Sequence, residues 1–463
     1  MRFRCAIVLA LACGAATGTL LAQEGGVQPQ AAQPQPAPVV FPPSGPQIRS
    51  VSAYAVYDSS FLPNGGAGFQ PGSANLPADF GAGGSIVLEW NKFTERSTFA
   101  LNYTPSYTGY VRNSQLNALN HALSLTISHK IAPRWTLSFS AAGNLSSLEQ
   151  SLFAPTTLGN VAAAPATFND LAAAMLSAKF TTNPLLGTIL TSSPLVESPI
   201  SNLLYGQRMF TSSAYVSLSH SYSPRLSVTV SGGGARTQQV SQNQTPGTTT
   251  AALIPNTTSG NASVGLSYSL SPFTQVGGTA TTIRTSSSIF DSYTTNALAT
   301  LGHTFAMRWL IQLHGGVGFI SPVRQIAAVM PAKPGPVIGG SLVYKTMSHT
   351  FLGSYDRTVS DSYGLGAATT STATASWHWR HPGNSWWFDS SFNWQQLLGG
   401  ALATTSGWHT TVGLTRTIGT HIALMTQYVH MNYSGGLQAT TYHFSQDAMR
   451  VSIAWTPRPA ALP

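Results

Sequence analysis

Residues 262–270 read Ala-Ser-Val-Gly-Leu-Ser-Tyr-Ser-Leu, and this stretch decides the fold class. Apolar residues stand at every second position, and only serine or glycine stands between them. Because successive side chains of a strand point to opposite faces, this period of two predicts a strand with one apolar and one small polar face. The same alternation recurs from residue 48 onward, for example over 97–104, 122–130 and 134–142, and helical periodicity is nearly absent.

Tight turns join the predicted strands in pairs. Ser271-Pro272-Phe273 follows the stretch quoted above, and Ala132-Pro133-Arg134 and Ser223-Pro224-Arg225 separate the strands of two further pairs. Strands reject proline, and turns favour it. The connections between one pair and the next are longer and rich in Gly, Ser, Thr, Asn and Pro, and the longest is 147–208. Short turns at one end and long loops at the other are the layout of an outer-membrane barrel.

The alternating segments number eighteen, and their length of about 10 residues is what a tilted strand needs to cross a bilayer. An even number leaves both termini on the side of the short turns, as bacterial barrels require. Sixteen strands is the alternative if the first strand pairs poorly or a late pair is misread. The segments are 48–57, 84–92, 97–108, 119–130, 134–146, 209–222, 226–236, 260–270, 274–284, 293–305, 309–319, 336–345, 350–357, 367–379, 386–395, 405–416, 421–431 and 440–456.

The composition excludes several classes of protein. Only 8% of the 463 residues are charged, whereas soluble domains carry about 25%. The net charge of +9 comes from 22 basic and 13 acidic residues with no basic run, so we expect no nucleic-acid partner. The only cysteines are Cys5 and Cys13, both in the leader described next. A mature chain without them has neither a disulfide framework nor thiol chemistry.

The N-terminal part differs from the alternating part. Residues 1–22 read as a signal peptide, with Arg2 and Arg4 before an apolar run and cleavage after Ala22. A lipoprotein site at Cys13 is the minor alternative. Residues 23–47 are rich in proline and glutamine and predict an extended periplasmic linker. The barrel then covers 48–456, and 457–463 form a C-terminal tail.

With these features the chain resembles a bacterial outer-membrane β-barrel of porin type. The resemblance implies an all-β, up-and-down antiparallel transmembrane barrel with short periplasmic turns and long extracellular loops. The last strand resembles the terminal assembly signal of such barrels, with Met449, Val451, Ile453 and Trp455 alternating. The resemblance is architectural, and no motif identifies a narrower family. It implies a location in the bacterial outer membrane, contact with its lipid, and small hydrophilic solutes as partners, and it leaves a homo-oligomer open.

The two faces of the strands predict different surroundings. Aromatic residues gather near strand ends, as in the interfacial girdles of membrane barrels. The opposite face is small and rich in hydroxyl groups, which predicts an open aqueous channel of weak selectivity. The aromatic residues assigned to the girdles are Trp135, Tyr222, Phe305, Trp309, Trp386, Trp387 and Trp455 on the turn side and Trp408 toward the loops.

Basic residues collect at or beside the short turns, where Glu95 is the only acid. One interpretation is that they reach anionic headgroups of the inner leaflet. The other is a cationic pore mouth that favours anions. The predicted periplasmic rim consists of Lys130, Arg134, Arg225, Arg308, Lys345, Arg380 and Arg416, and Lys92 and Arg96 lie beside the same turns.

The long segment 147–208 is the third connection on the loop side. In porins the third loop commonly narrows the lumen, so the resemblance implies a constriction here, with a short helix over Thr167–Lys179. The alternative is an external cap or contact surface. The candidate constriction residues are Leu171, Met175, Lys179, Leu186 and Glu197.

Motifs of catalysis are missing from the sequence. It contains no Gly-x-Ser-x-Gly elbow, no P-loop and no His-Glu-x-x-His motif. We therefore expect no enzyme activity, no catalytic residues, no cofactor and no metal. The sequence favours a pore for passive diffusion of small hydrophilic solutes. The alternatives are a structural or adhesive barrel with a plugged lumen and partner-binding loops and, more weakly, an outer-membrane hydrolase.

Overall fold

The computed structural model describes most of the alternating part of the chain. The chain divides into Met1–Phe41, which lies outside the described residues, and Pro42–Pro463, which contains all of them. The predicted signal peptide, 1–22, also lies outside them. The described residues are 45–59, 78–114, 117–147, 208–240, 256–271, 273–288, 290–306, 308–325, 335–346, 348–361, 367–381, 385–399, 405–419, 421–437 and 440–457.

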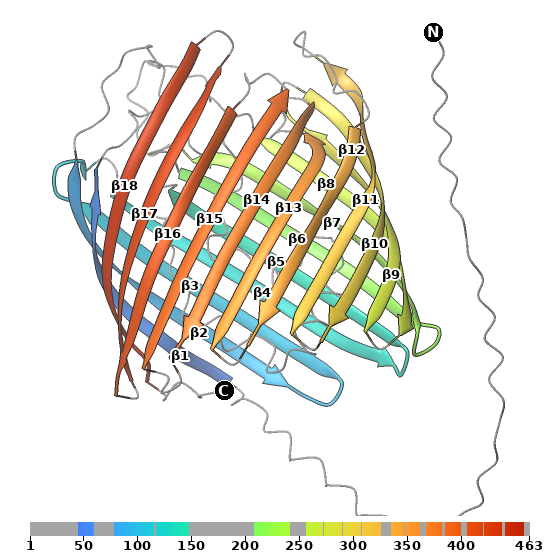
Figure 1. Cartoon of the computed structure of the whole chain (residues 1–463), viewed down its shortest axis with the longest axis horizontal. Helices are drawn as coiled ribbons and strands as arrows, with labels where there is room; N and C mark the ends of the chain where they lie inside the picture. The colour runs from blue at the N-terminus through green and yellow to red at the C-terminus, as the bar shows by residue number, and fades with distance from the viewer. Residues whose placement is uncertain are drawn as a thin grey trace, which may run out of the picture. The chain divides into compact units, whose positions relative to one another are not determined.

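Eighteen strands form one antiparallel sheet in chain order, and they are tilted against the barrel axis (Figure 1). Each predicted segment corresponds to one strand. The strands are β1 (Gly45–Asp58), β2 (Asp79–Phe93), β3 (Ser97–Tyr110), β4 (Ala118–Ala132), β5 (Trp135–Ser147), β6 (Arg208–Ser221), β7 (Leu226–Val240), β8 (Thr257–Ser271), β9 (Thr274–Ser286), β10 (Phe290–Phe305), β11 (Trp309–Gln325), β12 (Gly335–Lys345), β13 (His349–Asp361), β14 (Ala367–Arg380), β15 (Trp386–Gly399), β16 (Thr405–Ile418), β17 (Ile422–Leu437) and β18 (Thr440–Trp455).

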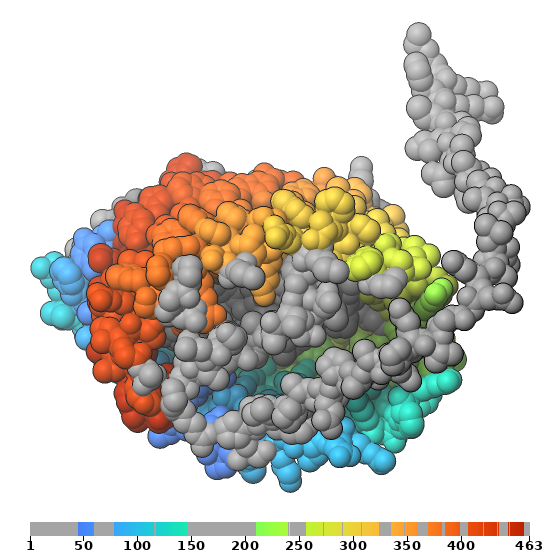
Figure 2. All heavy atoms as spheres, turned by 60° about the horizontal axis from the view of Figure 1, so that its bottom comes forward, coloured from blue at the N-terminus to red at the C-terminus, as the bar shows by residue number. Residues whose placement is uncertain are grey.

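The sheet closes on itself between its first and last strands. β1 pairs with β18 over a register that runs from Val51 opposite Trp455 to Asp58 opposite Ala448. Closure gives every strand two neighbours, which removes the exposed sheet edges that a bilayer cannot satisfy. Figure 2 shows the described strands as a ring in which the blue first strands lie beside the red last strands. The all-β up-and-down barrel of eighteen strands is thus confirmed, and the alternative of sixteen is wrong.

The short turns all lie at one end of the barrel, which we call the turn side, and the opposite end is the loop side. The turns range from Pro133 and Arg134 between β4 and β5 to five residues, 381–385, between β14 and β15. Gly419, between β16 and β17, has a φ of 68°, a conformation that glycine adopts without strain. None of the described segments is a helix long and apolar enough to span a membrane.

Two of the predicted loops are mostly strand. β17 continues to Leu437, so only 438–439 separate it from β18, where the sequence predicted a loop over 432–439. Likewise β10 begins at Phe290, within the predicted loop 284–292. The error has a physical cause: these strand ends carry polar residues at outward positions, as at Asp291 and Asn432, and the apolar Phe290 lies on the inner face. They therefore lose the alternation that identifies a strand, while their backbone ladder continues.

Contacts between next-but-one strands identify the inner face of the barrel. The hydroxyl of Tyr54 on β1 lies 2.6 Å from Thr108 Oγ1 on β3, across β2. Such contacts form on the concave face of a curved sheet, because side chains converge there. Tyr54 therefore points inward, and Val51 and Tyr57, which have the opposite parity and are each 36% exposed, point outward. The apolar residues of the alternating pattern consequently form the outer surface of the barrel.

Candidate functional site: the inner wall and the turn-side mouth

The inner faces of β5–β8 form a surface that we call the hydroxyl wall. Serine and threonine fill most of its positions, and no inner-face position of the described β5–β8 carries a charged residue. The hydroxyls pair across strands, as between Ser227 and Ser267 at 2.8 Å and between Ser231 and Ser263 at 2.6 Å. Hydroxyl groups donate and accept hydrogen bonds, so this wall can bind water or neutral polar solutes equally well.

The opposite part of the ring, the inner faces of β14–β18 and β1–β3, carries larger functional groups, and we call it the polar sector. At its centre the guanidinium of Arg450 lies 3.6 Å from the centroid of the Tyr54 ring, and Arg450 is only 3% exposed. Gly83 makes room for this ring, because a Cβ atom there would lie 2.6 Å from Tyr54 Cζ. The cation–π contact and the Tyr54–Thr108 hydrogen bond hold these side chains in place.

Two buried carboxylates lie nearer the loop side of the polar sector. Asp58 accepts hydrogen bonds from the Tyr110 hydroxyl at 2.9 Å and from Gln446 Nε2 at 3.2 Å, which links β1, β3 and β18. Asp79 accepts backbone hydrogen bonds through its Oδ2 atom, including one from Asn113 at 2.7 Å. A buried carboxylate costs free energy unless such donors satisfy it. The contacts of Asp58 therefore stabilise the closure between the first and last strands, whereas those of Asp79 hold the start of β2 against the residues that follow β3.

A second row of polar side chains crosses β14–β16. His378 Nδ1 lies 2.6 Å from Asp389 Oδ1, and these side chains are 39% and 50% exposed. Farther from the turn side, Thr374 donates to Asn393 Oδ1 at 2.7 Å, and Asn393 Nδ2 lies 2.9 Å from His409 Nε2. The polar sector thus presents acidic, basic and amide groups, whereas the hydroxyl wall is uncharged and consists mostly of serine and threonine.

Three predicted rim residues lie on the inner face at the turn-side ends of their strands. Lys130 lies opposite the inner-face residue Thr136 of β5, so it faces inward. Tyr344 faces outward, where its ring packs against Trp309 with ring centroids 4.4 Å apart, so the next residue, Lys345, faces inward. Arg380 ends β14 with its guanidinium 5.6 Å from the centroid of Trp387. All three cations therefore border the mouth of the lumen.

Arg134, Arg225 and Arg308 occupy equivalent places in three turns. Each is exposed and directly precedes the first residue of the returning strand. The carbonyl oxygen of each accepts a hydrogen bond from the following strand, whose donors are Ser221, Ser269 and Lys345 at 2.8–2.9 Å.

Arg96 repeats this arrangement, and its carbonyl accepts from the Lys130 N–H at 2.7 Å. Each of the four arginines stands in its turn, one position before an outward-facing strand residue. The backbone hydrogen bonds make Arg96 a neighbour of Lys130, and Arg308 a neighbour of Lys345, at the turn-side end of the barrel.

Two sequence assignments differ from this arrangement. Arg416, predicted in the pore rim, points outward with its guanidinium 5.0 Å from the centroid of Trp386, so the structure does not bring it to the mouth. Trp387, predicted in the girdle, lies on the inner face opposite Arg380. Both follow from register: one position along a strand reverses the face, and the pair Trp386–Trp387 does not show which member faces outward.

The outer surface carries aromatic residues at both ends. On the turn side, Trp135, Phe305 and Trp455 are 39–60% exposed. On the loop side, the sequence pointed only to Trp408, but outward aromatics extend around the ring. Their sequence signal is an outward-facing position in the alternation, several residues away from the nearest short turn. They are Tyr57, Phe80, Tyr107, Tyr293, Tyr355 and Tyr428.

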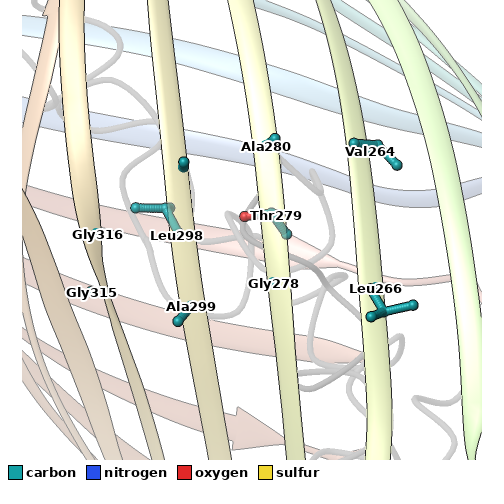
Figure 3. Close-up of a pocket in the computed structure, with 10 residues that line it drawn as sticks. Val264, Leu266, Gly278, Thr279, Ala280, Leu298, Ala299, Gly315 and Gly316 are labelled. Carbon is teal, nitrogen blue, oxygen red and sulfur yellow. The ribbon is translucent and has the colours of Figure 1, made fainter.

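A shallow depression lies on the outer face of β8–β11 (Figure 3). Val264 and Leu266 border it, both about half exposed, and Gly278, Ala280 and Gly315 form part of its floor. Small apolar residues line it almost throughout, so it belongs to the outer apolar surface and offers a hydrophilic ligand little to bind. Among the described residues, no three His, Cys, Asp or Glu side chains gather in a way that could hold a metal ion.

The candidate constriction residues Leu171, Met175, Lys179, Leu186 and Glu197 lie outside the described residues, as does the predicted helix Thr167–Lys179. The polar sector, by contrast, is described and was missed in the sequence. A visible signal was Arg450, a charged residue inside a strand whose nearest inner-face positions on either side are Ala448 and Ser452.

Comparison with known proteins shows similarity in architecture alone. No protein-family model matches the chain, and no curated protein matches it. Similar solved structures include OccAB4 of Acinetobacter baumannii, with 10% identity, a TM-score of 0.41, and 89% of this chain and 98% of that chain covered. OccK2 (OpdF) of Pseudomonas aeruginosa in complex with glucuronate has 9% identity and a TM-score of 0.43, with 89% of this chain and 98% of that chain covered. The siderophore receptor PirA of the same organism has 10% identity and a TM-score of 0.37, with 89% of this chain and 80% of that chain covered.

Proposed function

We propose that this chain is a bacterial outer-membrane channel for the passive diffusion of small hydrophilic solutes. The observation that carries the proposal is the separation of the two faces of one closed sheet. The outer face is apolar between two aromatic zones, as a bilayer requires. The inner face is polar throughout the hydroxyl wall, where Thr126 of the adjoining β4 is also exposed.

The channel is weakly selective with a mild preference for anions. The hydroxyl wall contributes no charge, so it discriminates little between ions. Cationic side chains collect at the mouth, where Lys130 and Lys345 lie on the inner face with the turn arginines beside them, and Asp389 is paired with His378. We therefore favour the cationic-mouth interpretation of the rim over headgroup contact for these residues, and we assign headgroup contact to Arg416.

Conductance of the purified protein in planar bilayers tests the proposal. We expect discrete current steps, and in a salt gradient a reversal potential of the sign for anion preference. Liposome swelling should show that uncharged sugars enter too. A protein that inserts, shows heat-modifiable migration in gels and yet passes no current would contradict the channel.

A structural or adhesive barrel with a plugged lumen is the second candidate, and one observation favours it. Several inner-face apolar side chains are almost fully buried, namely Leu310 at 1%, Val343 at 2%, Leu352 at 7% and Met431 at 1% exposure. An empty aqueous channel would leave them in contact with water. Silence in the bilayer experiment, with the barrel intact, would favour this second function.

A further inference from the structure

The loop-side end of β13 separates from its neighbour β12. The two strands pair up to Ile338 opposite Arg357, and β13 then continues to Asp361. Beyond Arg357, β13 pairs with β14, with Val359 opposite Thr369 and Asp361 opposite Ala367. We call these paired ends, Thr358–Asp361 and Ala367–Thr370, the β13–β14 flap.

The flap leans onto the inner face of the barrel. Val359 is 1% exposed and packs in one cluster with Phe290, Ile320 and Val337, which lie on β10, β11 and β12. By strict alternation Val359 would point outward. It meets inner-face residues because the end of β13 crosses inside β12, as the contacts of β13 with β10 and β11 also show.

Gly318 on the inner face of β11 permits this approach. A Cβ atom at Gly318 would lie 3.3 Å from Val359 Cβ, 2.9 Å from Val337 Cγ2 and 2.4 Å from Asn296 Oδ1. A larger side chain at this position that is not bonded to residue 359 would therefore compete with the flap for the same space.

Polar atoms that lack partners lie along the same face. Three consecutive inner-face side chains of β10 each have a buried polar atom without a hydrogen bond: Ser292 Oγ, Thr294 Oγ1 and Asn296 Oδ1. Ser292 is 0% and Thr294 2% exposed. Arg357 Nε, where the flap begins, is also buried without a partner. Such groups favour any state in which water reaches them.

We propose that the β13–β14 flap is a gate in the barrel wall. In the inward position seen here it narrows the loop-side half of the lumen, and in an outward position it opens this half and hydrates the polar atoms of β10. Burial of Val359 against the apolar cluster favours the inward position, and the unpaired Ser292, Thr294 and Asn296 oppose it. Because these terms have opposite signs, the two positions differ in free energy by less than the larger of the two terms. The gate rests on the proposed channel function.

A disulfide between flap and wall tests the gate. Gly318→Cys with Val359→Cys places two Cβ atoms 3.3 Å apart, slightly closer than the roughly 3.5–4.5 Å of a disulfide, and the Asn296 and Val337 side chains must turn aside to admit the new Cβ atom. We expect the oxidised protein to remain at one low conductance level, and reduction to restore switching to a higher level. Mass spectrometry verifies that the bond has formed.

Gly353→Cys with Ala375→Cys is the matched control. These residues face each other across the same two strands, below the flap, and nothing lies within 4 Å of a Cβ atom at Gly353. Its oxidation should leave conductance unchanged. If the oxidised Gly318–Val359 variant conducts like its reduced form, the gate is wrong. If wild type and every reduced variant carry no current, the channel itself is wrong.

Two single substitutions should shift the gate in opposite directions. Thr294→Val removes an unpaired hydroxyl and should lower the ratio of open to closed dwell time by roughly fivefold, which corresponds to about 1 kcal/mol. Val359→Ser weakens the apolar contact and should raise that ratio. Equal dwell-time ratios in both variants and in wild type would overturn the proposal, whatever their thermal stability.

Discussion

The strands of the hydroxyl wall have 13–15 residues and those of the polar sector 14–16, and both regions have an apolar outer face, yet their inner faces differ in chemistry. Along β5–β8 the hydroxyls pair locally, each with the strand beside it. In the polar sector the contacts reach farther, as from Tyr54 across β2 to Thr108 and from Tyr110 across β2 to Asp58. The comparison teaches that a wet wall needs only small polar groups, whereas large buried groups require a specific set of partners across the barrel.

Gly83→Ala in the polar sector should lower the stability of the barrel more than any other substitution considered below. The new methyl would lie 2.1 Å from the Tyr107 carbonyl oxygen and 2.6 Å from the Tyr54 ring, so backbone and ring must both move. We expect a loss of roughly 1–3 kcal/mol or failure to assemble. Gly143→Ala on β5 is the control, because nothing lies within 4 Å of its Cβ position. The temperature at which the folded band disappears from gels measures both, and equal temperatures would refute the argument.

Arg450→Met should have the next largest effect. It keeps the bulk of the side chain but removes the cation above Tyr54, a contact worth about 1–2 kcal/mol when desolvated. In detergent micelles, the urea concentration at the midpoint of unfolding should be lower than for wild type. Met is a close match in length, so a shift to higher concentration would mean that desolvation of the guanidinium outweighs its contacts.

Changing Arg134, Arg225, Arg308 and Lys345 together to Gln should alter permeation without altering stability. These residues border the mouth, and their backbone hydrogen bonds do not depend on the side chains. We expect the reversal potential in a salt gradient to move toward zero. Arg416→Gln, on the outer face, is the control and should leave it unchanged. An unaltered reversal potential in the fourfold variant would instead support the interpretation that the rim residues contact lipid headgroups.

The smallest effect is expected in the hydroxyl wall. Ser231→Ala removes one member of the pair with Ser263, which water can replace on a wet wall, so stability should change by no more than about 0.5 kcal/mol. The urea midpoint and the single-channel conductance should both match wild type. A clear loss of stability would show that the wall hydroxyls act as a connected network, and would remove the difference between the two sectors.

Much of the fold was predictable because its signal is local. Alternation over 262–270 and the turns at Pro133 and Pro224 required no knowledge of distant residues, and they indicated the strands and the turn side correctly. The rim was partly predictable for the same reason, since Arg134, Arg225 and Arg308 stand beside turns. The face of Arg416 was not, because a strand end beside a turn allows a shift of one residue, and that shift exchanges lumen for lipid.

The sequence by itself determined that this chain forms an even-stranded barrel with an apolar outside and a hydroxyl-rich inside. The reason is that the alternation of apolar and small polar residues can be recognised from neighbouring residues alone. Only the tertiary structure decided which inner side chains meet. Closure places Arg450 of the last strand above Tyr54 of the first, and curvature brings Val359 of β13 onto Phe290 of β10. Such contacts depend on the register and curvature of the whole ring, and neither is encoded in the alternation of any single strand.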